Sequence, residues 1–259
     1  MVTDMSDETN AKTEVSKWFI VTYAPVSLFS LRMTRATSKG GKTLLVPTPY
    51  SFKMALLDAC FRVFQSSDAE TTARKVFHLI KNIEIRFSPP SHCIVQNTFV
   101  KIRQEERDAP KGFFVPTIAY REFCFYGGDK LQVALLIDGL ENKEIVLIET
   151  LCMHINCIGK RGSFWQYEEN TILRGNLPEN YTRSDYNNTV GDNHSRWLQE
   201  LDDFGQPLCE DENGFDRIST YGKGEIKLGK HRVLMKTLIP YCFKRSSRHF
   251  TQYEKIQNE

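Results

Sequence analysis

Two glycine-bearing stretches carry residue types that contact phosphates. The first, CIGKRGSFWQY at residues 157–167, places glycines around a pair of cations and aromatic side chains directly after them. Glycine backbone can approach a phosphate or sugar closely, the cations can neutralise charge, and an aromatic ring can stack on a base. This combination predicts contacts to single-stranded nucleic acid from Gly159, Lys160, Arg161, Gly162, Ser163, Phe164 and Trp165.

The second stretch, ATSKGGKT at residues 36–43, fits a relaxed phosphate-loop pattern. With an apolar strand ending in Asp138 as a magnesium partner, it would indicate a nucleotide hydrolase dependent on Lys42. That chemistry requires the loop to open directly into a helix, whose first amides hold the phosphates. Pro47 and Pro49 interrupt such a helix. The stretch is therefore better interpreted as a mobile basic loop, although the hydrolase remains an alternative.

Charge is distributed unevenly along the chain. The formal net charge is only +2, yet no acid lies between Glu14 and Asp58 or between Glu225 and Glu254, and both intervals are rich in lysine and arginine. If these basic blocks meet in the fold, they form a surface suited to a polyanion. The candidates for phosphate contact are Arg32, Arg35, Lys39, Lys42 and Lys53 in the first block and Lys244, Arg245, Ser246, Ser247 and Arg248 in the second.

Tyr50 and Lys53 are expected near the start of a helix. The unpaired amides of a helix N-terminus add partial positive charge there. An anionic backbone docked at this point would meet the tyrosine, the lysine and the amides together. Tyr50 therefore joins the predicted nucleic-acid contacts.

Composition excludes several classes of protein. The chain has 41% hydrophobic residues and 25% charged residues, as expected for a soluble globule, and no window resembles a membrane span. The seven cysteines are scattered singly, which predicts reduced thiols and a cytoplasmic location. No spacing suits a metal site, and no cofactor is expected. Residues 1–16 resemble no targeting signal and are expected to form a disordered tail.

The periodicities predict an α+β protein. Strands are expected at 18–32 and 83–87, helices at 51–64, 68–80 and 140–156, and hairpins at 93–126 and 113–138, with further strands after residue 230. This order is the split βαβ pattern, which favours a ferredoxin-like (RRM-like) antiparallel sheet with helices on one face. Residues 17–259 are expected to form a single domain, in which 168–220 is an irregular acidic insertion with twelve acids between 168 and 216.

Four segments in this order resemble a known family. VPTPYSFKMALLDAC, TIAYREFCFYGG, INCIGKRGSF and IPYCFKRSSRHFTQY together look like the Cas-five subunit of type I CRISPR Cascade complexes, a member of the RAMP superfamily. The resemblance covers roughly residues 17–165 and 229–254. The segment between them matches nothing that we recognise.

The resemblance implies a RAMP-like domain with a β-hairpin thumb at about 94–117. Such a subunit would cap the 5′ handle of the crRNA and contact the large subunit and the first backbone subunit, with target DNA nearby. It would act in the cytoplasm without contacting a membrane or forming a homo-oligomer. Carried over by position, the thumb would contact RNA or the neighbouring subunit through Lys101, Arg103, Arg107 and Lys111.

The resemblance also bears on whether the chain cleaves RNA. One branch of the family is a metal-independent endoribonuclease that uses a tyrosine, a lysine and a histidine, and Tyr50 could match that tyrosine. No Lys-His pair follows the thumb, however, and the adjacent pair Lys230 and His231 lies near the C-terminus. We therefore expect a binding protein that is not an enzyme, with the endoribonuclease as the alternative.

Overall fold

The computed structural model describes residues 15–37, 40–106, 108, 110–184, 196–220 and 222–256. Lys39, Arg107 and residues 1–14 of the predicted tail lie outside these ranges. Within them, no helix combines the length and the apolar character needed to cross a lipid bilayer.

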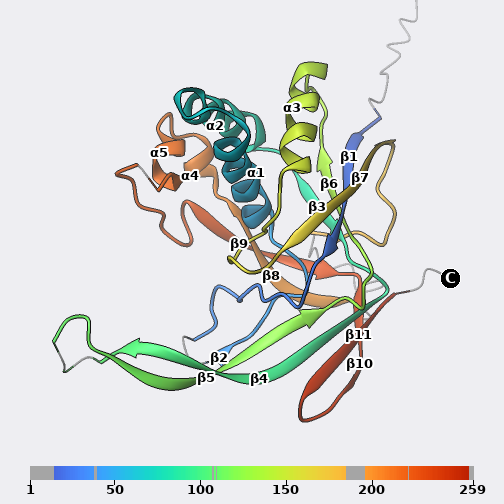
Figure 1. The fold of residues 1–259 in the computed structure, drawn as a ribbon. Coiled ribbons are helices and arrows are strands. Elements are labelled where there is room, and N and C mark those ends of the chain that lie inside the picture. Colours follow the sequence, from blue (N-terminus) through green and yellow to red (C-terminus); the bar gives the residue numbers. More distant parts are fainter. Residues whose placement is uncertain are drawn as a thin grey trace, which may run out of the picture.

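The first sheet, which we call sheet A, has the predicted split βαβ arrangement. Its strands stand in the order β3-β6-β1-β7, and every neighbouring pair is antiparallel. Along the chain, a helical segment connects β1 to β3 and another connects β6 to β7 (Figure 1). The strands are β1 (Lys17–Pro25), β3 (Ile85–Ser88), β6 (Leu131–Leu136) and β7 (Trp165–Arg174).

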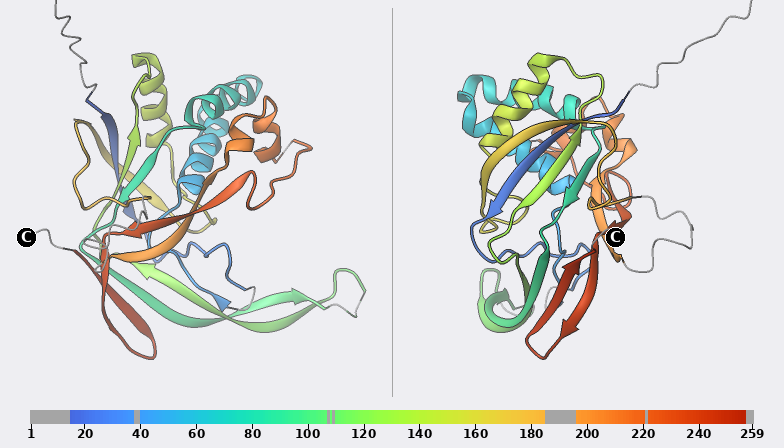
Figure 2. Two further views of the ribbon diagram at one scale, coloured as in Figure 1. Left: turned by 180° about the vertical axis from the view of Figure 1, so that it is seen from behind. Right: turned by 90° about the vertical axis from the view of Figure 1, so that its right-hand side faces the viewer.

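Three helices lie on one side of sheet A (Figure 2). They are α1 (Pro49–Val63), α2 (Ser66–Ile80) and α3 (Asn142–Met153). The N-cap of α1 is Thr48, whose hydroxyl accepts a hydrogen bond from the Ser51 amide, while the Ser51 hydroxyl accepts one from the Thr48 amide. The helix thus begins before its expected start at residue 51, because proline is well tolerated in a first helical turn.

Alternate side chains of β1 enter two different apolar clusters. Phe19, Val21 and Tyr23 belong to the main core, which also contains the buried faces of the helices. Trp18 and Ile20 pack with Tyr181, which belongs to the chain after β7. Both faces of sheet A are therefore covered along β1.

The second sheet, sheet B, contains the predicted hairpin. Its order is β10-β11-β4-β5-β2, from β10 (Tyr241–Ser246), β11 (Phe250–Lys255), β4 (His92–Glu105), β5 (Phe114–Phe125) and β2 (Gly40–Gly41). The far end of the β4–β5 hairpin projects away from the body of the protein (Figure 1). The predicted thumb at 94–117 covers most of β4, the turn and the first residues of β5.

Residues 168–220 differ from the expected irregular insertion. They contain most of β7, the strand β8 (Trp197–Phe204), and two short helices, α4 (Gln206–Cys209) and α5 (Gly214–Ile218). Strand β8 pairs antiparallel with β9 (Arg232–Ile239). The sequence pattern missed β8 because Asp202 and Asp203 look like loop residues, although each is paired with a cation in the fold.

Candidate nucleic-acid interface

A cavity of about 680 Å³ brings together segments that are far apart in the sequence. It lies between the start of α1, the glycine loop at 156–164, the loop that begins at Leu31, and the ribbon formed by β8 and β9. Its charged lining residues are five cations and two acids: Arg32, Arg62, Lys160, Arg161, Arg232, Asp58 and Asp202. The two basic blocks of the sequence meet here, because Arg232 Nη2 lies 3.4 Å from Thr34 Oγ1.

The glycine loop is closed by its own backbone. The Ser163 amide donates to the Lys160 carbonyl at 3.0 Å, and Gly159 and Gly162 have φ of 78° and 97°. Glycine is favoured at position 159 by its positive φ, and a Cβ there would also have to displace the Leu31 side chain, whose Cδ2 would lie 2.7 Å away. The loop thereby carries Lys160 and Arg161 to an exposed tip beside the cavity.

Two of the five cations are neutralised within the site. Arg62 pairs with Asp58 at 3.0 Å, and Arg232 pairs with Asp202. Within the described ranges, Arg32, Lys160 and Arg161 have no acidic partner; the Arg32 guanidinium donates to the Ala36 carbonyl. The cavity is therefore electropositive, and it suits an anionic ligand.

Tyr50 lines the same cavity. Its ring lies 4.5 Å from the Arg232 guanidinium and packs against Phe204. Burial raises the pKa of Tyr50, and the positive charge of Arg232 opposes this only in part. The hydroxyl therefore stays protonated at neutral pH, where it can donate a hydrogen bond but does not act as a base.

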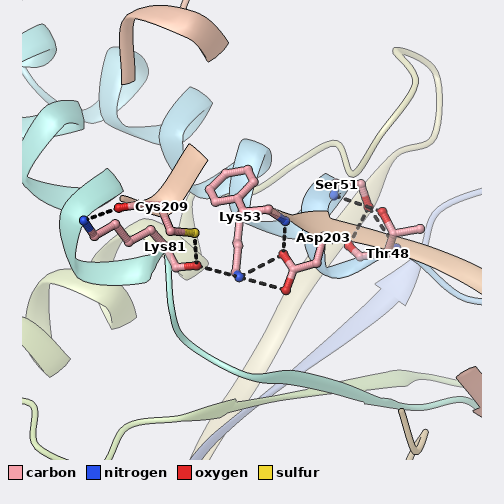
Figure 3. Close-up of polar contacts among 7 residues, drawn as sticks. Thr48, Ser51, Lys53, Lys81, Asp203 and Cys209 are labelled. Atoms are coloured by element: carbon pink, nitrogen blue, oxygen red, sulfur yellow. Dashed lines mark hydrogen bonds and ion pairs between the residues drawn. The ribbon is translucent and has the colours of Figure 1, made fainter. Parts of the chain in front are cut away.

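Lys53 is not at the surface. Its side chain is 1% exposed, and its ammonium lies 2.8 Å from Asp203 Oδ1 and 3.2 Å from the Lys81 carbonyl (Figure 3). Phe204 covers the same ammonium at 5.2 Å. The prediction that Lys53 contacts a nucleic acid is therefore wrong, because the ion pair with Asp203 holds it in the interior.

The aromatic residues of the glycine loop separate into two environments. Phe164 is 51% exposed and lines the cavity, whereas Trp165 is 2% exposed and packs against Phe29 at 4.9 Å between ring centroids. Only Phe164 is placed to stack on a base, and the predicted contact from Trp165 is corrected. The neighbouring Ser163 is also buried.

The basic cluster of the last hairpin forms a separate surface. Lys244, Arg245, Ser246, Ser247 and Arg248 are all exposed at the turn between β10 and β11, and none of them lines the cavity. Lys244 pairs with Glu254 at 2.9 Å, and Arg245 Nε donates to Gln252 Oε1 at 2.8 Å. The phosphate-contact candidates of the two basic blocks, which were expected to share one surface, therefore lie on two separate basic surfaces.

The remaining candidates lie outside the cavity. Lys101, Arg103 and Lys111 are exposed on the thumb hairpin, and Lys42 is exposed on the loop before α1. Arg35 is exposed but pairs with Glu200 at 3.1 Å. Sequence reasoning missed Arg62 and Arg232 as cavity residues. Arg232 could have been proposed as a candidate, because it lies in the acid-free basic block between Glu225 and Glu254.

The phosphate-loop hypothesis is contradicted by this geometry. Gly40 and Gly41 form β2, which pairs with β5, and the helix begins only at Pro49. Thr43 is 3% exposed, and its amide donates to Glu122 Oε2 at 2.9 Å. Thr43, which would be the hydroxyl residue after Lys42 in a phosphate loop, is thus enclosed, and no helix N-terminus directly follows the glycines.

In the Lys230–His231 pair, the histidine is not accessible for acid–base chemistry on a bound RNA. His231 is 4% exposed, and its Nδ1 accepts a hydrogen bond from the Lys227 amide. In the part of the chain that the structure describes, no three His, Cys, Asp or Glu side chains gather closely enough to hold a metal ion.

Part of the chain is similar in sequence to a known protein. No protein-family model matches the chain. A curated relative, CRISPR-associated protein Cas5 from Archaeoglobus fulgidus, is 22% identical over 114 residues, which cover 44% of this chain and 49% of the relative. The chain resembles a Cas-five protein. The matched part is about half the length of that relative.

Two solved structures are similar over most of the chain. The crystal structure of a CRISPR protein from Archaeoglobus fulgidus covers 93% of this chain and 92% of its own, with 13% identity and a TM-score of 0.43. A chain of a CRISPR RNA-guided surveillance complex covers 86% of this chain and 90% of its own, with 12% identity and a TM-score of 0.39.

Proposed function

We propose that this chain is a crRNA-binding scaffold subunit of a type I CRISPR Cascade complex. The observation that supports this most directly is the electropositive cavity, in which Arg32, Lys160 and Arg161 have no acidic partner among the described residues. A ribose-phosphate strand could satisfy these cations, and the exposed ring of Phe164 lies beside them for a base. The partial similarity to a Cas-five protein supports the same class of ligand.

In this proposal the chain caps the 5′ handle of the crRNA in the cytoplasm. The thumb hairpin contacts the first backbone subunit or the adjoining RNA through Lys101, Arg103 and Lys111. The large subunit is the second protein partner, with target DNA nearby. The chain contacts no membrane, requires no cofactor and acts as a single copy.

The proposed role is binding without cleavage. A metal-independent nuclease needs a base near the 2′-hydroxyl and an acid at the leaving oxygen. Burial keeps Tyr50 protonated, and the imidazole of His231 is enclosed. Cleavage of repeat RNA in EDTA that is lost in Tyr50→Phe would instead establish the endoribonuclease.

The test is the affinity of the purified chain for the repeat-derived 5′ handle, measured by fluorescence anisotropy over a range of salt concentrations. Binding should weaken steeply as salt rises. The double variant K160A/R161A should bind more weakly and lower the slope of log affinity against log salt by about 0.7 for each lost phosphate contact.

The matched control is K75A/K143A, which removes the same charge from the exposed surfaces of α2 and α3. It should keep the wild-type salt slope. Salt-independent or absent binding by the wild-type chain, also in the presence of its partner subunits, would contradict the proposal. An equal loss in both double variants would show that net charge, rather than the cavity, governs binding.

A further inference from the structure

A continuous row of side chains crosses the outer face of sheet B. Arg245 pairs with Gln252, Gln252 with Ile94, and Ile94 with Phe125 in the registers of four successive strands. The bridge between Phe29 and Cys124 then brings Leu28 beside Phe125. These five side chains, together with Gln96, His249 and Phe250, line a hollow of about 510 Å³, which we call the sheet B platform.

The platform is unusually apolar for a face that points to solvent. The opposite face carries Cys93, Val95 and Cys124, which are buried in the main core. An antiparallel sheet with one face on the core normally presents polar side chains on the other. Here Phe125 is 46% exposed and Leu28 is 42% exposed. Folding does not explain exposed rings at this position, so a ligand is the better explanation.

The polar groups around the platform indicate what that ligand is. Its lining contains no acid. The Arg245 guanidinium lies 5.7 Å from the Phe250 ring, and its Nε donates to Gln252 Oε1, so the arginine is held over the aromatic edge. Within the described residues, the side chains of Gln96 and His249 make no hydrogen bond, and both can donate and accept. Flat rings, unused amide groups and a fixed cation match a nucleobase and its phosphate.

We propose that the sheet B platform binds one base of a single-stranded RNA. The base stacks on Phe125 or Phe250, Gln96 and Gln252 contact its edge, and Arg245 contacts the adjoining phosphate. This rests on the proposed function, to which it adds a base-binding subsite outside the main cavity. On sheet A, by contrast, Tyr181 and the helices cover the two faces of β1.

A protein partner is the competing occupant of an exposed apolar hollow. Charge favours RNA, because Arg248 is exposed on the same turn as Arg245, and the hollow has no carboxylate to pair with a basic peptide. An apolar peptide would also leave the amide group of Gln96 without a partner. The platform therefore matches the polyanion better than a hydrophobic segment.

The experiment measures the binding of a fluorescein-labelled oligoadenylate to the full chain by anisotropy. At least one of Phe125→Leu and Phe250→Leu, the one that removes the stacking ring, should weaken binding by at least about 5-fold, the lower end of the cost of losing one base–aromatic stack. The slope of log affinity against log salt should not change, because no phosphate contact is lost. Phe125→Trp should restore affinity, since it returns a ring.

The matched control is Phe61→Leu, which makes the same change on α1, away from sheet B. Photo-crosslinking with 5-iodouridine oligonucleotides gives a second readout and should label the peptides that contain Phe125 or Phe250. All these variants should keep the wild-type melting temperature, because the altered rings are partly exposed.

The outcomes separate this inference from the proposed function. If the wild-type chain does not bind RNA, both fail. If the chain binds RNA but Phe125→Leu and Phe250→Leu keep full affinity and no crosslink falls on sheet B, the platform is refuted and the cavity proposal stands. If these variants keep RNA affinity but lose a purified partner subunit, the platform is a protein-docking surface and the inference is wrong.

Discussion

Removing the ammonium of Lys53 tests whether this residue is structural or binds RNA. Methionine has a similar length and no charge, so Lys53→Met leaves the Asp203 carboxylate in its partly buried position without a cation. Burial already raises the pKa of Asp203, and Lys53 opposes that rise. The variant therefore retains a carboxylate that is costly to keep ionised.

The expected loss is large because both charges are enclosed. The side chains of Lys53 and Asp203 are 1% and 15% exposed, and the ammonium lies 2.8 Å and 3.0 Å from the two carboxylate oxygens. Breaking such a pair by removing one partner costs ~3–5 kcal/mol in free energy of unfolding. The double variant K53M/D203N removes both charges of this pair and keeps an acceptor for the Phe204 amide, so it should recover to within ~1–2 kcal/mol of the wild type.

The assay is urea denaturation, combined with RNA affinity under conditions in which each variant is folded. The loss in Lys53→Met should shrink as the pH falls. A carboxylate whose pKa is raised by folding contributes stability below its unfolded pKa and loses that contribution as the pH rises through its folded pKa. RNA affinity should equal that of the wild type. Additive losses in the double variant, or weaker RNA binding by folded Lys53→Met, would refute this account of the site.

Two further predictions concern cysteines and glycines. Five of the seven cysteines are buried, and burial raises the pKa of Cys60 and Cys152 to about 12. A chromogenic disulfide at mildly alkaline pH should therefore modify Cys242 first and Cys157 next, whereas the buried thiols should react only after unfolding. Rapid reaction of more than two thiols in the native state would contradict the buried positions. Gly162→Ala should cost ~1–2 kcal/mol through its left-handed backbone alone, whereas Gly159→Ala should cost more because its methyl group meets Leu31, as thermal unfolding can show. Equal losses at the two positions would contradict this packing.

Sheet A and its helices could be predicted because their signals are local. Strand β1 is rich in β-branched and aromatic residues, and α1 repeats apolar side chains at helical spacing up to Phe61. The order of these elements restricts the sheet to few topologies. The β4–β5 hairpin could be predicted for the same reason, because the sequence shows two long strands around a polar turn.

The side-chain environments were harder to predict. Lys53 lies three and four residues before the buried Leu56 and Leu57, so its helical face indicated burial, yet its charge favoured the surface. Phe164 and Trp165 are neighbours in extended backbone at the start of β7, so their side chains point to opposite sides, but the sequence does not say which one faces solvent. Strand β8 was missed because the partners of Asp202 and Asp203 come from other elements of the fold.

The position of β11 has a consequence for how the chain assembles during synthesis. Sheet A is complete once β7 has been made, whereas β11 stands between β10 and β4 and pairs with both. Sheet B therefore stays open along β4 until residues 250–255 leave the ribosome. A nascent chain that stalls before this point presents an unpaired strand edge, which favours aggregation. Substitutions that weaken β11 should therefore reduce the yield of folded protein more than equally buried changes in β1.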